Sequence, residues 1–338
     1  MQEQRESSFS SEEKSIFKMM TGFFTSRVLA VAVELDLFTW LAGRPRGVDE
    51  IRGHLGFAER PCRIFLDSLV SLGLLDASGG SYRNSSLAET LLVQGRPDFQ
   101  GPHIRLFDHL YGACTDLKSA LLEDRPTSTD YTYFFDGEER AVSRYSGLMH
   151  DSSLVPALTL PQYWDFSESA CVLDVGGGYG RLCLTLTSQH PELETILFDL
   201  PEVCARTRTL LAEHPHLAAR IRLHPGDFLR DELPRGADTI VLMRIMHDWP
   251  REQACRLLRR AFEALPSGGR LLIYETLRDQ GPRPGDAAFI SLLLLLISPG
   301  GECRSFPELH AWLREVGFGR IELIPTVYFY GLVAAEKP

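Results

Sequence analysis

A glycine-rich run follows a short apolar segment near the middle of the chain. The apolar residues 171–173 lead into Asp174, and glycine occupies positions 176, 177, 178 and 180. The next segment, 181–189, has a helical pattern, so the sequence predicts a strand, a glycine turn and a helix. Glycine lets backbone approach a ligand closely, and in an open α/β sheet such a turn lies where nucleotide-like ligands bind.

The spacing of these glycines differs from that of a dinucleotide-binding turn. That fingerprint is Gly-x-Gly-x-x-Gly/Ala, and counted from Gly176 the third required position is Arg181. Asp199 ends the next apolar segment, and Asp227 with Phe228 follows the one after it. Carboxylates there can accept hydrogen bonds from ribose hydroxyls and from an adenine amine, and a phenyl ring can cover the adenine face.

Three acids at successive strand ends, without a phosphate-binding lysine, predict a nucleoside ligand that lacks phosphates, such as S-adenosylmethionine (SAM). The alternative is a set of ordinary turn acids with no ligand. The order of the three acids along the chain favours the ligand.

A histidine follows the fourth apolar segment, 239–243. Pro250 is typical of a helix start, so His247 is expected near the carboxyl end of that strand. A histidine has a pKa close to neutrality and can take a proton from a phenol. A packed or capping histidine is the alternative. The location favours function, because sites in open α/β sheets gather at these strand ends.

From residue 170 onward, predicted strands and helices alternate, which indicates a Rossmann-like, mostly parallel sheet with helices on both faces. The predicted strands are 171–175, 195–199, 221–225, 238–243, 270–275, 320–325 and 330–335, and the predicted helices centre on 185, 208, 257, 293 and 311.

The N-terminal part has a different pattern. Helices are expected over 12–43, and two short helices with a small hairpin over 48–82 form a winged-helix pattern. We therefore divide the chain into a winged-helix-like dimerisation domain (1–105), a helical linker and substrate-pocket region (106–166) and a SAM-binding domain (167–338). Apolar side chains at helical spacing, among them Phe23, Phe24 and Val28, favour a homodimer.

Charge excludes several other classes of protein. The net charge of −10 argues against a nucleic-acid or anionic-membrane partner. Residues 1–105 hold 12 Lys and Arg against 13 Asp and Glu, a net charge of −1, which disfavours a DNA-binding winged helix or a ligand-binding regulator. The longest apolar run, 292–297, is far below the ~20 residues of a membrane span.

The cysteines and the N-terminus bear on location. The seven cysteines are scattered without a Cys-x-x-Cys pair, which is typical of reduced thiols and predicts no metal site. No secretory signal precedes them. A cytoplasmic location is therefore expected.

Several motifs occur in a family order. They are the glycine run, Phe198-Asp199-Leu200-Pro201, Gly226-Asp227-Phe228, His247-Asp248-Trp249 and Gly268 to Ile273, preceded by Glu34 to Phe38 and Ser71 to Leu75. With them nearly the whole chain resembles the SAM-dependent small-molecule O-methyltransferases of the caffeate and hydroxyindole type, which have bacterial relatives in natural-product pathways.

The resemblance implies roles for individual residues. His247 would be the general base and Glu275 the acid that orients it. SAM, whose product is S-adenosylhomocysteine, would be held by Asp174, Gly176, Gly178, Asp199, Leu200, Asp227, Phe228, Met243 and Arg244. A small aromatic substrate would contact Phe135, Met149, Met246, Asp248, Glu302 and Cys303, with Met149 packing on its ring.

The chain departs from the family in the segment after residue 299. Relatives have Gly-Gly-x-Glu-Arg-Thr, whose glutamate is a second partner of the catalytic histidine, whereas Cys303 stands at that position here and Glu302 comes one residue early. Met243 stands where many relatives have lysine, and Ser291 where aspartate is common. Loss of a carboxylate should lower the basicity of His247.

The predicted function is transfer of the SAM methyl group to a small aromatic acceptor, at a phenolic oxygen, in secondary metabolism. The altered segment leaves open a more acidic acceptor, a Glu302 that reaches the histidine, or different chemistry. Ring C-methylation of a phenol is one alternative, and a diverged, non-methylating SAM-binding enzyme or regulator is another.

Overall fold

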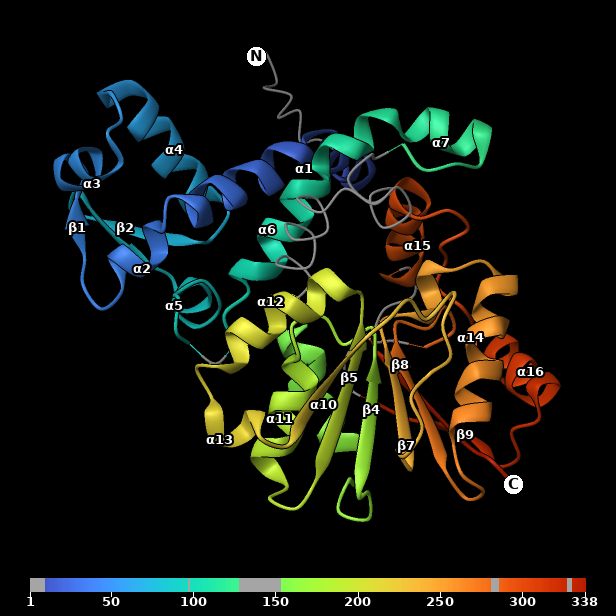
Figure 1. Ribbon diagram of the computed structural model, residues 1–338. Coiled ribbons are helices and arrows are strands. Elements are labelled where there is room, and N and C mark those ends of the chain that lie inside the picture. The colour runs from blue at the N-terminus through green and yellow to red at the C-terminus, as the bar shows by residue number, and fades with distance from the viewer. Residues whose placement is uncertain (1–9, 97, 128–152, 281–285, 327–329) are drawn as a thin grey trace. The chain divides into compact units, whose positions relative to one another are not determined.

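The computed structural model describes residues 10–96, 98–127, 153–280, 286–326 and 330–338. The chain folds into two compact units, Met1–Tyr111 and Gly112–Pro338, whose elements are labelled in Figure 1. Helix α6 (Gly101–His109) runs across position 105, where the sequence analysis placed its first boundary. The three-part division therefore stays a prediction.

The N-terminal unit is mainly helical and carries one small antiparallel sheet of order β1-β3-β2. Leu66 and Leu69 of α4 are fully buried together with Leu37 and Phe38 of α2, and they form the centre of its core. This arrangement is the predicted winged-helix pattern. Besides α6 its elements are α1 (Ser11–Glu34), α2 (Leu37–Leu41), β1 (Arg46–Gly47), α3 (Val48–Leu55), α4 (Glu59–Ser71), β2 (Leu75–Ser78), β3 (Ser81–Asn84) and α5 (Ser86–Leu91).

Helix α1 begins at a capping box formed by Ser10 and Glu13 and pairs with α6 inside this unit. Among the described helices it alone is long and apolar enough, by length and composition, to cross a membrane. It also exposes large apolar side chains, including Phe17 (64% exposed) and Phe24 (61%). An exposed apolar face of this kind marks an interaction site for another protein chain or for a membrane.

The C-terminal unit is built on a seven-stranded sheet of order β6-β5-β4-β7-β8-β10-β9. The five neighbouring strands β6, β5, β4, β7 and β8 run parallel to one another, and β10 is antiparallel to both β8 and β9. The strands are β4 (Cys171–Val175), β5 (Glu194–Asp199), β6 (Ile221–Pro225), β7 (Thr239–Met243), β8 (Arg270–Glu275), β9 (Ile321–Ile324) and β10 (Gly331–Glu336).

Helices cover both faces of this sheet (Figure 1). Leu173 and Val175 of β4 point to the face under α14 and α16, while Val172 points to the face under α10 and α11. The helical segments are η1 (Leu110–Asp116), α7 (Leu117–Glu123), α10 (Leu154–Tyr163), α11 (Arg181–Gln189), α12 (Pro201–Leu211), α13 (Pro215–Ala218), η2 (Met246–Asp248), α14 (Arg251–Ala264), α15 (Asp286–Ile297) and α16 (Phe306–Val316).

The strand order reverses at β4, which has β5 on one side and β7 on the other. In open α/β sheets ligands bind in the crevice outside the carboxyl ends of the strands at such a switch point. The glycine turn leaves β4 at this edge, and the segment with His247 leaves β7 there. The fold therefore brings the predicted site residues to one edge of one sheet.

Candidate active site

The glycine turn between β4 and α11 depends on left-handed backbone. Gly176 has φ +68° and Gly178 has φ +56°, a region that L side chains rarely adopt. A Cβ on Gly176 would lie 2.5 Å from Ile245 Cδ1 and 3.6 Å from Phe228 Cε1, so the turn lies against the segments that follow β7 and β6. A Cβ on Gly178 would meet open space. This open side leaves room for a ligand to approach the backbone.

Asp199, at the end of β5, is tied to the glycine turn. Its Oδ2 accepts a hydrogen bond from Gly178 N–H and its Oδ1 one from Leu200 N–H, each at 2.7 Å. Burial raises the pKa of Asp199 to about 6, and these two bonds oppose the rise. A carboxylate has about four lone-pair sites, so two remain, and the residue is only partly buried. Asp199 is therefore able to accept hydrogen bonds from the ribose of a SAM molecule.

Asp227 and Phe228 lie beyond the end of β6, whose Pro225 pairs with Asp199 of β5. Asp227 Oδ1 accepts from Leu229 N–H at 2.8 Å, which shapes the turn, while its side chain stays 30% exposed. Phe228 packs edge-to-face against Trp249 with ring centroids 5.6 Å apart. The aromatic face is thus fixed close to Gly176, where an adenine would need a cover.

Asp174 lies beneath the turn rather than on its surface. It is 1% exposed, and a Cβ on Gly177 would fall 2.7 Å from its Oδ2. Its other described contact is the thiol of Cys183, at 3.7 Å. Burial raises the pKa of Asp174 to about 7. In this structure Asp174 supports the turn from below, which differs from the direct ligand contact expected from the sequence.

His247 lies in the short helix η2 after β7, next to Glu275 at the end of β8. The His247 backbone N–H donates to Glu275 Oε2 at 2.9 Å, and the imidazole Nδ1 lies 3.2 Å from the same oxygen. His247 is 7% exposed and Glu275 1%. The sequence prediction that these two residues meet agrees with this geometry.

Three buried atoms of this cluster have no hydrogen-bond partner among the described residues: His247 Nδ1, Glu275 Oε1 and Asp248 Oδ1. His247 Nε2 lies 3.8 Å from Asp248 Oδ1. Buried polar atoms are nearly always paired in proteins, and exceptions need an explanation such as catalysis or a bound molecule. The cluster has the unpaired polar capacity that a proton-transfer site for a small ligand requires.

Burial controls the charges of these groups. Burial first, and then the positive charges of Arg244 and Arg304, lower the pKa of His247 to about 3. Burial raises the pKa of Glu275 to about 8, with Asp248 adding to the rise, and it raises that of Asp248 to about 7. The imidazole is therefore uncharged at neutral pH, with a free lone pair, and the same burial makes it a weak base.

The remaining residues predicted beside β7 have different surroundings. Arg244 has φ +61°, which is uncommon for a residue other than glycine and costs of order 1–3 kcal/mol. Met243 is half-buried at the strand end. Met246 is fully buried in the core under α14, so it packs beneath the site and does not line a pocket as expected. Phe135 and Met149 lie outside the described residues.

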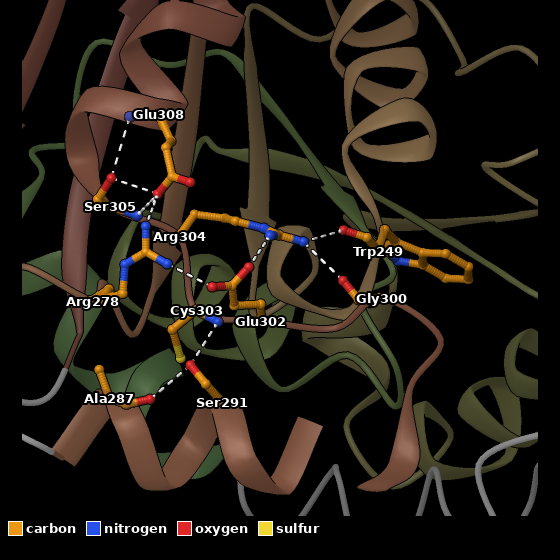
Figure 2. Close-up of polar contacts among 10 residues, drawn as sticks. All are labelled: Trp249, Arg278, Ala287, Ser291, Gly300, Glu302, Cys303, Arg304, Ser305 and Glu308. Atoms are coloured by element: carbon orange, nitrogen blue, oxygen red, sulfur yellow. Dashed lines mark hydrogen bonds and ion pairs between the residues drawn. The ribbon is translucent and has the colours of Figure 1, made fainter. Parts of the chain in front are cut away.

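The segment that departs from the family pattern is shown in Figure 2. Cys303 is fully buried, and its backbone N–H donates to Ser291 Oγ at 3.1 Å. The Glu302 carboxylate is paired with two arginines: it accepts from Arg278 at 2.5 Å and from Arg304 at 2.6 Å. Neither residue places a carboxylate on His247. The possibility that Glu302 reaches the histidine does not hold in this structure.

Four contacts hold the backbone of residues 247–249. Glu275 accepts from His247 N–H, and Glu302 N–H donates to the His247 carbonyl at 2.8 Å. Ser298 Oγ donates to the Asp248 carbonyl. Arg304 donates to the carbonyls of Trp249 and Gly300, each at 2.9 Å. The segment 298–304 thus clamps the turn that carries His247 against β8.

Sequence reasoning missed Arg304, Arg278 and Ile245 as parts of this site. Arg304 is 7% exposed, and its guanidinium also lies 5.5 Å from the Trp312 ring. A buried arginine in a loop leaves no periodic signal.

The described residues contain no group of three His, Cys, Asp or Glu side chains that could hold a metal ion.

Family models match most of the chain. Residues 106–319 match an O-methyltransferase domain, and residues 17–94 match an O-methyltransferase dimerisation domain. The chain belongs to this family of SAM-dependent O-methyltransferases, as the sequence motifs predicted.

Individual relatives agree with that assignment. The chain is 34% identical over 313 residues to 3-hydroxy-5-methyl-1-naphthoate 3-O-methyltransferase of Streptomyces sahachiroi, covering 90% of this chain and 89% of that protein. It is 33% identical to the N,N-dimethyltransferase OxyT of Streptomyces rimosus, with 97% of each chain covered. The crystal structure of human N-acetylserotonin methyltransferase in complex with SAM superposes with a TM-score of 0.86 at 27% identity, covering 98% and 99% of the two chains.

The clamp predicts different outcomes for two arginines that bind the same carboxylate. Arg304→Lys keeps the charge but loses the planar fork, so buried carbonyls are left unpaired and unfolding should become easier by about 1–3 kcal/mol. Arg278, 46% exposed, is the matched control, and Arg278→Lys should cost less than about 1 kcal/mol. Urea unfolding of both variants measures this, and equal losses would contradict the clamp.

Proposed function

We propose that the protein transfers the methyl group of SAM to a hydroxyl oxygen of a small aromatic molecule in secondary metabolism. The observation that carries this proposal is the buried, uncharged imidazole of His247, held beside Glu275 at the sheet edge where the glycine turn and Asp199 also lie. A base at this place is required for oxygen acceptors that reach the site protonated.

The residues present fit SAM. The open side of Gly178, the two free lone-pair sites of Asp199 and the ring of Phe228 suit the tail, ribose and adenine of that molecule. Leu200, Asp227, Met243 and Arg244 border the same edge. When bound, SAM supplies a methyl group on a sulfonium, which an oxygen nucleophile can displace.

His247 would accept the acceptor proton at Nε2, because Nδ1 faces Glu275. Glu275 holds the ring at its other nitrogen, because Nδ1 lies 3.2 Å from Glu275 Oε2. Asp248, 3.8 Å from Nε2, lies on the acceptor side of the ring and is the residue most able to touch the substrate there. The clamp of residues 298–304 holds the imidazole in one orientation, and orientation is a large part of methyl-transfer catalysis.

N-methylation is the second candidate. The relative OxyT, 33% identical over nearly the whole chain, is named an N,N-dimethyltransferase. An amine acceptor also has to lose a proton, so the same His247 geometry serves both reactions. Ring C-methylation of a phenol gives the same mass gain as O-methylation.

His247→Ala should lower the methyl-transfer rate by about 10²–10⁴-fold, the usual contribution of a general base, and leave SAM affinity nearly unchanged. Turnover is measured on an acceptor found by incubation with SAM and a panel of phenols, and affinity by calorimetry. The control is His216→Ala, at an exposed histidine of α13. A His247→Ala enzyme with wild-type turnover would make His247 structural.

Asp199→Ala should weaken SAM binding at least tenfold, since ribose hydroxyls left without an acceptor cost about 1–3 kcal/mol. Glu192→Ala removes an exposed carboxylate from the loop that precedes β5, at the other edge of the sheet, and should bind SAM normally. Calorimetry on both folded variants tests this. Unchanged affinity in Asp199→Ala would remove the ribose assignment.

We further propose a homodimer formed through the N-terminal unit, supported by the dimerisation-domain match and by the exposed apolar side chains of α1. The double variant Phe17→Glu with Phe24→Glu should be monomeric at micromolar concentration, because charges replace the buried contact. Leu158→Glu, at a 42% exposed position of α10, is the control. Light scattering distinguishes the states, and a wild-type monomer would contradict the proposal.

A further inference from the structure

The surroundings of His247 differ from those of an imidazole meant to be a strong base. In the described residues one carboxylate, Glu275, approaches Nδ1. The position where the family has a second partner holds the neutral, fully buried thiol of Cys303, next to the hydroxyl of Ser291. Cys303 in place of glutamate and Ser291 in place of aspartate both leave this wall of the site without a negative charge.

The nearby acid cannot replace the lost one without breaking ion pairs. Glu302 accepts from Arg278 at 2.5 Å and from Arg304 at 2.6 Å (Figure 2). Its backbone N–H donates to the His247 carbonyl at 2.8 Å. The Glu302 carboxylate is therefore occupied by two arginines.

Positive charge remains in the site. Arg244 at the end of β7 and Arg304 before α16 act on the imidazole from two elements, and both disfavour its protonation. Of the acids that face it, Glu275 on β8 and Asp248 on η2 are buried and shifted toward their neutral forms. Burial also raises the pKa of Cys303 to about 11, so this wall stays uncharged. The net positive charge around the imidazole therefore favours a bound anion and disfavours protonation of His247.

On the basis of the proposed function, we propose that this site selects acceptors of high acidity, whose hydroxyl group reaches it already ionised. Hydroxyquinones, and phenols with electron-withdrawing or hydrogen-bonding carbonyl substituents, are the chemical class that meets this requirement. The acceptor oxygen then forms the O–CH₃ bond as the S–CH₃ bond breaks, the electron pair leaves with sulfur, and no proton needs to be removed. Toward such an acceptor the neutral His247 donates its Nε2–H to the phenolate oxygen and orients it, and it acts as a base only for acceptors that arrive protonated.

The first test reads ionisation directly. 4-Nitrophenol changes its absorption when it ionises, so a pH titration of the probe bound to the enzyme with S-adenosylhomocysteine gives its acidity in the site. In the wild type its ionisation constant should rise at least tenfold over that of the free probe. In Cys303→Glu the rise should disappear. In Cys303→Gln, where the new side chain has the size of glutamate but no charge, the rise should persist. A wild-type probe that binds in its neutral form overturns the inference.

The second test uses turnover, with phenol and pentafluorophenol, which differ greatly in acidity and little in size. In the wild type kcat/KM should favour pentafluorophenol at neutral pH at least tenfold, and the phenol profile should rise until phenol itself ionises. Cys303→Glu should shift the preference toward phenol. Equal rates for both acceptors, with a shared inflection, contradict the inference but leave the proposed function standing. No methyl transfer to any phenol in a broad panel would remove the proposed function itself.

Discussion

The contact between Glu275 and His247 is the constraint on which the rest of the site depends. A buried carboxylate at the end of β8 accepts the backbone N–H of His247 and lies 3.2 Å from its imidazole. Because β8 and β7 are parallel neighbours, with Met243 opposite Tyr274, this contact fixes the turn after β7 on the sheet. The glycine turn after β4 then lies against Ile245 of the same segment. The Glu275 carboxylate thus contacts both the ring and the backbone of His247, in the segment that also lies against the glycine turn.

The clamp formed by residues 298–304 completes this arrangement from the other side. It contacts the His247, Asp248 and Trp249 carbonyls with a backbone amide, a hydroxyl and a buried guanidinium. A site that lacks the family's second carboxylate still keeps its histidine in one orientation. Backbone contacts fix the orientation of His247 here, while burial and the neighbouring arginines lower its pKa.

Much of this could be predicted from the sequence because it follows from local rules. The glycine turn, the seven strands and the helix starting at Arg181 come from apolar periodicity and from residues that only a turn accommodates. The pairing of Glu275 with His247 was implied by the resemblance to the family, and the structure brings the two residues within 3.2 Å of each other. Asp174 and Met246 could not be placed, because alternation along a strand or short helix does not tell a buried support from a ligand contact. The ion pairs of Glu302 depend on Arg278, 24 residues away, and no local pattern encodes them.

The central claim is transfer of the SAM methyl group to an oxygen atom, and the chemical shift of the new methyl carbon tests it most directly. The enzyme is supplied with SAM labelled with ¹³C in its methyl group and with an acidic hydroxyaromatic acceptor, and the product is examined by carbon NMR. A single labelled resonance is expected in the range of aryl methyl ethers, coupled across oxygen to the ring. A labelled methyl bonded to nitrogen or to a ring carbon would contradict it.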